Sequence, residues 1–138
     1  KERKSNNHPY PDEISYSMTI QGLENKAAEA ASEKHNAALD SMVQKDFKKA
    51  AVLFEEALLV LKHDKSVSFR IFGNLGICYA LMGEREKSFE ALREALRHNP
   101  DYDRARRHLS ELEAMSEAQY KKFLKTGPDS LTHTEWHE

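Results

Sequence analysis

Two stretches of this chain repeat one spacing of small and large side chains, and this repeat restricts the fold more than any other feature. Three positions in the first stretch fall 38 residues before three in the second: Ala50, Phe54 and Ala57, then Ser88, Leu92 and Ala95. Steps of three and four residues place each set on one face of a helix. Similarity at a fixed period is typical of stacked units, each of which buries its apolar face against a neighbour.

The composition also favours helices. The 138 residues include only 5 Gly and 4 Pro, too few for the many turns of an all-β fold. With 39% hydrophobic and 32% charged residues, the chain can bury one core and keep a charged exterior. We therefore expect an all-α fold. The predicted helices cover 23–44, Phe47 to Leu61 with Asp46 as N-cap, Phe69 to Gly83, Glu84 to Asn99 before Pro100, and 103–125.

The two ends differ from this helical domain, which we place at 23–126. Residues 1–22 are predicted to be a linker or docking segment, with four apolar residues alternating with polar ones: Ile14, Tyr16, Met18 and Ile20. The alternation favours an extended segment, whereas Asp12 as a cap favours a short helix, and both interpretations stay open. Residues 127–138 are predicted to be a flexible tail. The chain does not begin with Met and lacks an apolar signal region, so we expect it to be part of a longer protein.

One pair of predicted helices carries a family pattern. Its eight positions are Phe72, Leu75, Gly76, Tyr79, Ser88, Leu92, Ala95 and Pro100. With these residues the stretch 69–102 resembles a full tetratricopeptide repeat. The resemblance implies a right-handed stack of antiparallel helix hairpins, in which Gly76 and Ala95 let two helix backbones approach. A second unit is expected at about 28–64, with the helix at 103–125 as a cap.

The register of the first unit has two solutions. One starts the repeat at Glu33–Asn36 and needs about three extra residues before Asp46. The other places Ala38 at the small position and needs none. Both registers stay open.

The resemblance also implies a binding site. In this family the first helix of each unit lines a concave groove that holds a peptide or a partner helix. The groove positions of this chain are Asn36, Arg70, Asn74, Ile77, Arg104 and His108. We therefore predict a protein–protein interaction scaffold or adaptor, whose partner is a protein or peptide of acidic or mixed character.

Some members of the family hold the acidic C-termini of chaperones in a carboxylate clamp of two Asn, two Lys and an Arg. Asn36 and Asn74 coincide with the clamp asparagines, and Arg104 replaces a lysine. Ser32 and His108 stand where a lysine and an arginine belong. Since a serine and a neutral histidine cannot form charge-assisted bonds to a dicarboxylate, a general groove is favoured over the clamp.

A structural role is the alternative. The half-apolar strip from Ile14 to Ile20 resembles an extended ligand, so the module could be closed by its own N-terminal segment or could self-associate. A homo-oligomer therefore stays open.

Other classes of function are disfavoured. The net charge of -2 and the acidic residues beside Arg104, Arg106 and Arg107 argue against nucleic acid and an anionic membrane surface. No run of 18 apolar residues exists. The chain has no nucleophile elbow, phosphate loop or paired-acid motif, so we predict neither an enzyme nor a cofactor.

Single residues with reactive side chains have ordinary explanations. Cys78 is the only cysteine, which excludes an internal disulfide, suits a cytoplasmic protein and predicts a buried thiol. His133 and His137 are four apart, but no third ligand is near them in the sequence, so no metal site is predicted. Trp136 is predicted either to mark a contact or to dock back on the domain.

Overall fold

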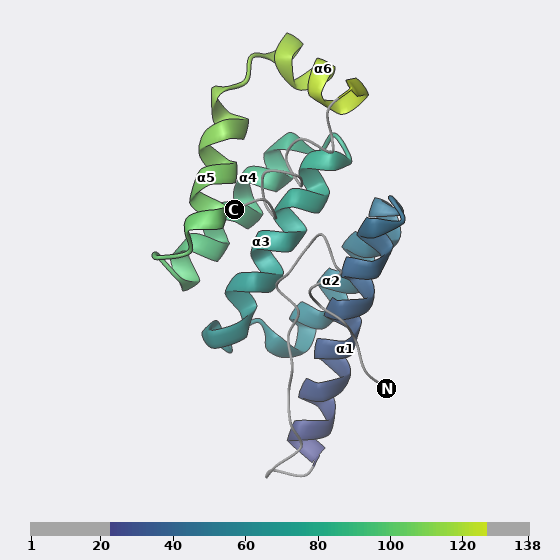
Figure 1. Ribbon diagram of the computed structural model, residues 1–138. Helices are drawn as coiled ribbons and strands as arrows, with labels where there is room; N and C mark the ends of the chain where they lie inside the picture. Colours follow the sequence, from purple (N-terminus) through teal and green to yellow (C-terminus); the bar gives the residue numbers. More distant parts are fainter. Residues whose placement is uncertain (1–22, 127–138) are drawn as a thin grey trace.

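The computed structural model describes residues 23–126, with side chains from 26 to 125. Within this range all regular structure is helical, which confirms the all-α prediction (Figure 1). The helices are α1 (Leu23–Val43), α2 (Phe47–Leu61), α3 (Lys65–Leu81), α4 (Arg85–His98), α5 (Asp103–Ala114) and α6 (Glu117–Thr126). The predictions for residues 1–22 and 127–138, including His133, Trp136 and His137, lie outside the described residues.

Local chemistry sets the ends of these helices. The Asp46 carboxylate accepts a hydrogen bond from the Lys49 backbone N–H at 3.3 Å, which confirms Asp46 as the N-cap of α2. Asp64 caps α3 in the same way, so α3 begins at Lys65, before the first apolar residue of its pattern. Gly83 follows α3 with a φ of 86°, the left-handed conformation that ends many helices.

From α1 to α5, each helix packs against the next one in the sequence, and α3 also contacts both α1 and α5 (Figure 1). The most extensive contacts are those of α1 with α2 and of α3 with α4. Short turns join these helices, so the members of each pair run in opposite directions. The odd-numbered helices α1, α3 and α5 are therefore neighbours in space and form one row.

The contact between α3 and α4 depends on a glycine. A Cβ atom at Gly76 would lie 2.7 Å from Leu92 Cγ and 3.3 Å from the Leu92 backbone nitrogen. Leu92 and Ala95 are fully buried. The expected close approach at Gly76 is therefore present. A second glycine, Gly73, accommodates the ring of Tyr102, because a Cβ atom at Gly73 would lie 2.7 Å from Tyr102 Cε2.

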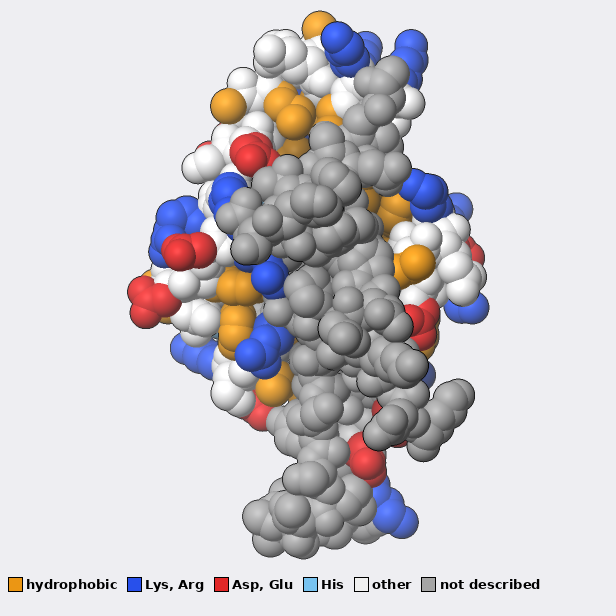
Figure 2. Space-filling model, in the orientation of Figure 1, with side chains coloured by type: hydrophobic (Ala, Val, Ile, Leu, Met, Phe, Trp, Pro, Cys, Tyr) orange, Lys and Arg blue, Asp and Glu red, His pale blue; other side chains and the backbone are white. Residues whose placement is uncertain are grey.

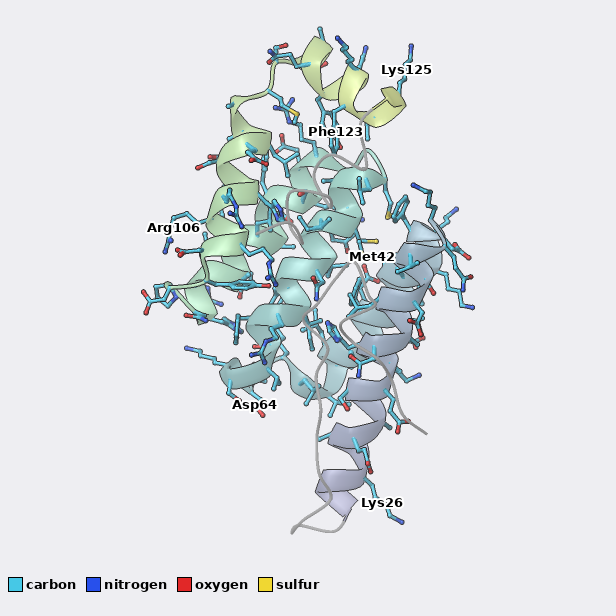
Figure 3. The ribbon with its side chains drawn as sticks, viewed as in Figure 1. Lys26, Met42, Asp64, Arg106, Phe123 and Lys125 are labelled. Atoms are coloured by element: carbon cyan, nitrogen blue, oxygen red, sulfur yellow. The ribbon has the colours of Figure 1, made fainter. Side chains whose placement is uncertain are left out.

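The first helix pair buries the corresponding positions. Ala38 and Phe54 are fully buried, 38 residues before Gly76 and Leu92 respectively. This correspondence favours the register that places Ala38 at the small position. Met42, near the C-terminal end of α1, is also buried (Figure 3).

The predicted single helix over 103–125 is wrong, because the chain breaks between α5 and α6. Met115 has extended backbone angles. Ser116 then begins a capping box: its hydroxyl accepts from the Gln119 N–H at 3.1 Å, and the Gln119 side-chain oxygen accepts from the Ser116 N–H at 2.7 Å. These reciprocal bonds stabilise the start of a new helix.

Helix α6 folds back over the end of α3. Tyr120 donates its hydroxyl hydrogen to the Ala80 carbonyl at 2.7 Å. Arg85 donates to the Leu112 carbonyl at the end of α5, and its guanidinium lies 5.0 Å from the Tyr120 ring centroid. The buried Phe123 points from α6 toward the other helices (Figure 3). Together these contacts cover one end of the core.

Candidate functional site

The groove residues predicted from the sequence come from the three neighbouring odd-numbered helices. Asn36 lies on α1, Arg70, Asn74 and Ile77 lie on α3, and Arg104 and His108 lie on α5. At about 100° of rotation per residue, Arg70, Asn74 and Ile77 fall within about 60° of one another on α3. Since α1 contacts α3 and α3 contacts α5, the fold places these helices in one row.

Burial divides the predicted residues into two groups. The half-buried ones are Asn36, Arg70 and Arg104. The buried ones are Asn74, Ile77 and His108, with 4%, 5% and 1% of their surface exposed. Only the first group has side-chain surface for a ligand in this structure, with Arg70 held 4.9 Å above the Phe69 ring.

A buried histidine links the two predicted asparagines. His35 Nε2 lies 3.1 Å from Asn74 Nδ2, and His35 Nδ1 lies 3.1 Å from Asn36 Oδ1. An amide nitrogen only donates, so Nε2 accepts, and the ring proton on Nδ1 is donated to Asn36. The His35 ring also packs at 5.3 Å from the Phe54 ring. One amide proton of Asn74 is therefore used in a buried hydrogen bond to His35, a role that the sequence did not predict.

Two of the five clamp positions are closed to a ligand. Ser32 is 3% exposed and donates its hydroxyl hydrogen to the Glu29 carbonyl of its own helix at 2.8 Å. His108 is 1% exposed. Neither residue presents a cation at the surface, so the geometry does not favour a carboxylate clamp.

A separate pocket of about 310 Å³ lies between α3 and α4. Its lining residues are Phe72, Leu75, Tyr79, Lys87, Glu90, Ala91 and Glu94. Burial is the main cause that raises the pKa of Tyr79, and the bond that its hydroxyl donates to Glu55 acts in the same direction. The Lys87 ammonium lies 5.4 Å from the Tyr79 ring centroid. The pocket thus has an apolar floor and a charged rim, although the sequence predicted only core positions at Phe72, Leu75 and Tyr79.

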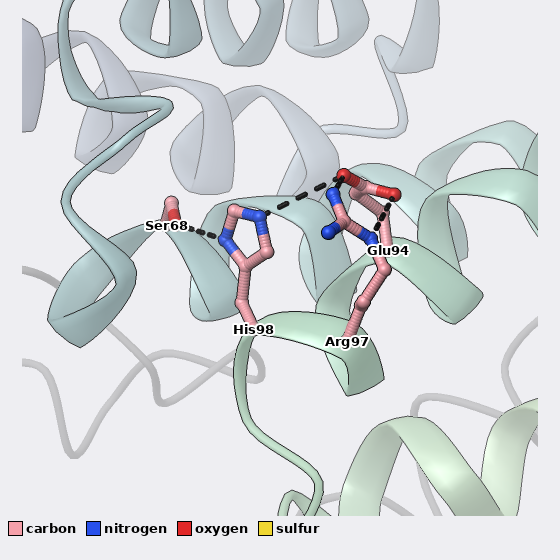
Figure 4. Close-up of polar contacts among 4 residues, drawn as sticks. All are labelled: Ser68, Glu94, Arg97 and His98. Carbon is pink, nitrogen blue, oxygen red and sulfur yellow. Dashed lines mark hydrogen bonds and ion pairs between the residues drawn. The ribbon is translucent and has the colours of Figure 1, made fainter.

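A serine, a histidine and a glutamate meet at the far end of the same helix pair (Figure 4). Ser68 Oγ lies 2.6 Å from His98 Nδ1, and His98 Nε2 lies 3.7 Å from the Glu94 carboxylate. Burial lowers the pKa of His98, which keeps the ring neutral at pH 7. Ser68 is fully buried, so a substrate carbonyl could not reach its oxygen. The arrangement joins the first turn of α3 to the last turn of α4.

The thiol of Cys78 is also inaccessible. Cys78 is fully buried and donates to the Phe47 carbonyl at 3.0 Å. Burial is the main cause that raises the pKa of this thiol to about 12, so it is not a thiolate at neutral pH. The prediction of a buried thiol is confirmed.

The arginine-rich segment is balanced by acidic neighbours. Arg97 pairs with Glu94, and Arg106 pairs with Asp103. Charges of both signs are interspersed over the described part of the face in Figure 2. Among the described side chains, no three His, Cys, Asp or Glu residues gather closely enough to hold a metal ion. Within residues 23–126, every helix is too short or too polar to cross a membrane.

Comparisons of the chain with protein-family models, with curated proteins and with solved structures gave no match. The geometry of this chain is therefore the basis on which a function can be assigned.

Proposed function

We propose that this chain is a protein-interaction module built as a tetratricopeptide-like stack. In this arrangement α1 and α2 form the first hairpin, α3 and α4 form the second, and α5 with α6 caps them. The contacts of α1 with α3 and of α3 with α5 support the proposal, because stacked hairpins bring alternate helices together. The free Cys78 suits a reducing compartment, and we place the module in the cytoplasm.

The row of α1, α3 and α5 binds an extended or helical segment of a partner protein that carries acidic side chains. One observation carries this assignment: half-buried Asn36, Arg70 and Arg104 come from three helices that are neighbours in space. Two guanidinium groups can each form bidentate bonds with carboxylates, and the Asn36 amide can bond to a peptide backbone.

Selection of peptides from a random-sequence display library tests this function. We expect the full chain to enrich sequences containing Asp and Glu. Arg70→Ala with Arg104→Ala should weaken the best selected peptide about tenfold or more, since bonds to charged groups contribute most of such affinity. Arg106→Ala is the matched control, because Arg106 lies on α5 but points away from the helices (Figure 3). Equal loss in the control, or enrichment without acidic residues, would contradict the proposal.

Closure of the same row by the chain itself is the second candidate. The burial of Asn74, Ile77 and His108 favours it, since these residues were expected to line an open groove. The proposed occupant, residues 12–22, lies outside the described residues. Deleting residues 1–22 should then expose Ile77 and increase hydrogen exchange along α3. Unchanged exchange, with unchanged stability and peptide affinity, would exclude closure by this segment.

A further inference from the structure

We propose that the pocket between α3 and α4 binds a lysine side chain of a partner protein. This site is independent of the proposed function, because it lies on the other side of α3. At about 100° per residue, Phe72, Leu75 and Tyr79 centre about 170° away from Arg70, Asn74 and Ile77. A pocket of about 310 Å³ is at the small end of ligand sites and suits one long side chain.

The first hairpin contains the same interaction within one chain. Lys34 Nζ on α1 lies 3.0 Å from Glu56 Oε1 on α2. The residues 38 positions later are Phe72 and Glu94, and both line the pocket. The second hairpin therefore keeps the glutamate of this pair but has no lysine at the corresponding position. A lysine supplied from outside would restore the pair.

The lining suits both parts of a lysine side chain. Phe72, Leu75 and Ala91 offer an apolar wall for the four methylene groups. Glu90, which is exposed, and Glu94 offer carboxylates for the ammonium group. The bond from Arg97 lowers the pKa of Glu94, so this carboxylate is ionised at neutral pH. A carboxylate has about four acceptor positions, and Glu94 can accept a further donor beside Arg97.

The surrounding charges favour a cation over an anion. The acidic groups in or beside the pocket are Glu55, Glu84, Glu90 and Glu94, and the basic groups are Lys62, Lys87 and Arg97. Lys87 lies over the Tyr79 ring, and Arg97 is paired with Glu94. Glu90 therefore adds uncompensated negative charge to the rim, which makes the pocket complementary to an ammonium group.

Titration of the ¹⁵N-labelled full chain with a short peptide tests the site. The probe is acetyl-Gly-Gly-Lys-Gly-Gly-amide, followed by amide chemical shifts. We expect saturable shifts at the lining residues of α3 and α4. The norleucine and Nε-acetyl-lysine analogues keep the carbon chain but lack the charge. Their affinity should be lower by about tenfold or more. Equal binding of these analogues, or shifts confined to other helices, would overturn the proposal.

Variants assign the binding to the carboxylates. Glu90→Gln with Glu94→Gln should weaken the lysine peptide about tenfold. Glu90→Gln alone, at an exposed position, should weaken it measurably and cannot disturb the core. Glu86→Gln is the matched control, because Glu86 is exposed on α4 and does not line the pocket. Unchanged affinity in the double variant would overturn the site. Equal affinity for pentane-1,5-diamine would overturn the assignment to a partner's side chain in favour of a free amine.

Discussion

The two hairpins bury equivalent positions with different side chains. The first pairs Ala38 with Phe54, whereas the second has Gly76 and Leu92 at the positions 38 residues later. At Gly76 the missing methyl group leaves room for Leu92, whose Cγ would be 2.7 Å from a Cβ there. The two hairpins therefore keep the same spacing of buried positions while they fill the space between their helices with different volumes.

The outer sides of the hairpins differ more. In the first hairpin an ion pair between Lys34 and Glu56 joins α1 to α2, whereas in the second hairpin Phe72 and Glu94 line an open pocket. Three exposed residues of α2 are apolar where their counterparts in α4 are polar: Val52, Leu59 and Val60 correspond to Glu90, Arg97 and the largely buried His98. The two hairpins therefore agree in the spacing of their buried positions and differ in the chemical character of their outer positions.

The largest effect is expected in the first hairpin. Phe54→Ala should lower the free energy of unfolding by about 3–5 kcal/mol, because Phe54 is fully buried and packs against His35. Urea unfolding followed by circular dichroism measures this change. A loss below about 1 kcal/mol would mean that Phe54 is not the central residue of this hairpin.

A pH dependence is expected from the second hairpin, where His98 corresponds to Val60 of the first. Burial lowers the pKa of folded His98 below its ordinary 6.5, with Arg97, Lys65 and His63 acting in the same direction and Glu94 opposing them. The unfolded chain therefore binds more protons below pH 6.5, and stability falls as the solution is acidified from there.

His98→Gln tests this, because glutamine does not titrate and can still bond to Ser68. Its stability should change less than that of the parent between pH 7.5 and 5.5, measured by urea unfolding at each pH. An identical slope in both proteins would remove His98 as the cause.

A smaller effect is expected at the ion pair between Lys34 of α1 and Glu56 of α2. Lys34→Met should cost about 0.2–1 kcal/mol, because the Lys34–Glu56 pair is about half exposed to solvent. Lys48→Met, at an exposed position of α2, serves as the control for the loss of charge. A loss of several kcal/mol at Lys34 alone would show that the pair is shielded from water.

The smallest effect is expected on the outer side of α2. Leu59→Arg introduces the residue type of its counterpart Arg97, and Leu59 is 86% exposed. Stability should stay within about 0.5 kcal/mol of the parent. A larger loss, together with a change in sedimentation, would show that a second copy of the chain covers this residue.

The helices and their spacing could be predicted because local chemistry determines them. Asp46, Gly83 and Pro100 mark boundaries within a residue or two of those observed. The sequence also contains a signal for the break before α6, because Ser116 and Gln119 have capping-box spacing. No Gly or Pro accompanies this signal.

The site was less predictable because it depends on contacts between distant residues. The His35 bond to Asn74 joins positions 39 residues apart, and no local pattern indicates it. The lysine-sized pocket arises from residues on two helices, several of which have the spacing of core residues. Position within a repeat could therefore place Asn74 and Ile77 on the row of odd-numbered helices, but it could not give their burial.

A double-mutant cycle at Gly76 and Leu92 tests the packing on which the second hairpin depends. In the parent, Gly76→Ala should destabilise the protein by about 1–3 kcal/mol, because the new methyl group meets a buried leucine. In the Leu92→Ala background the leucine side chain is removed and only the 3.3 Å approach to the backbone nitrogen of residue 92 remains, so Gly76→Ala should cost at least about 1 kcal/mol less than in the parent. Equal effects of Gly76→Ala in the two backgrounds would contradict the close contact between α3 and α4.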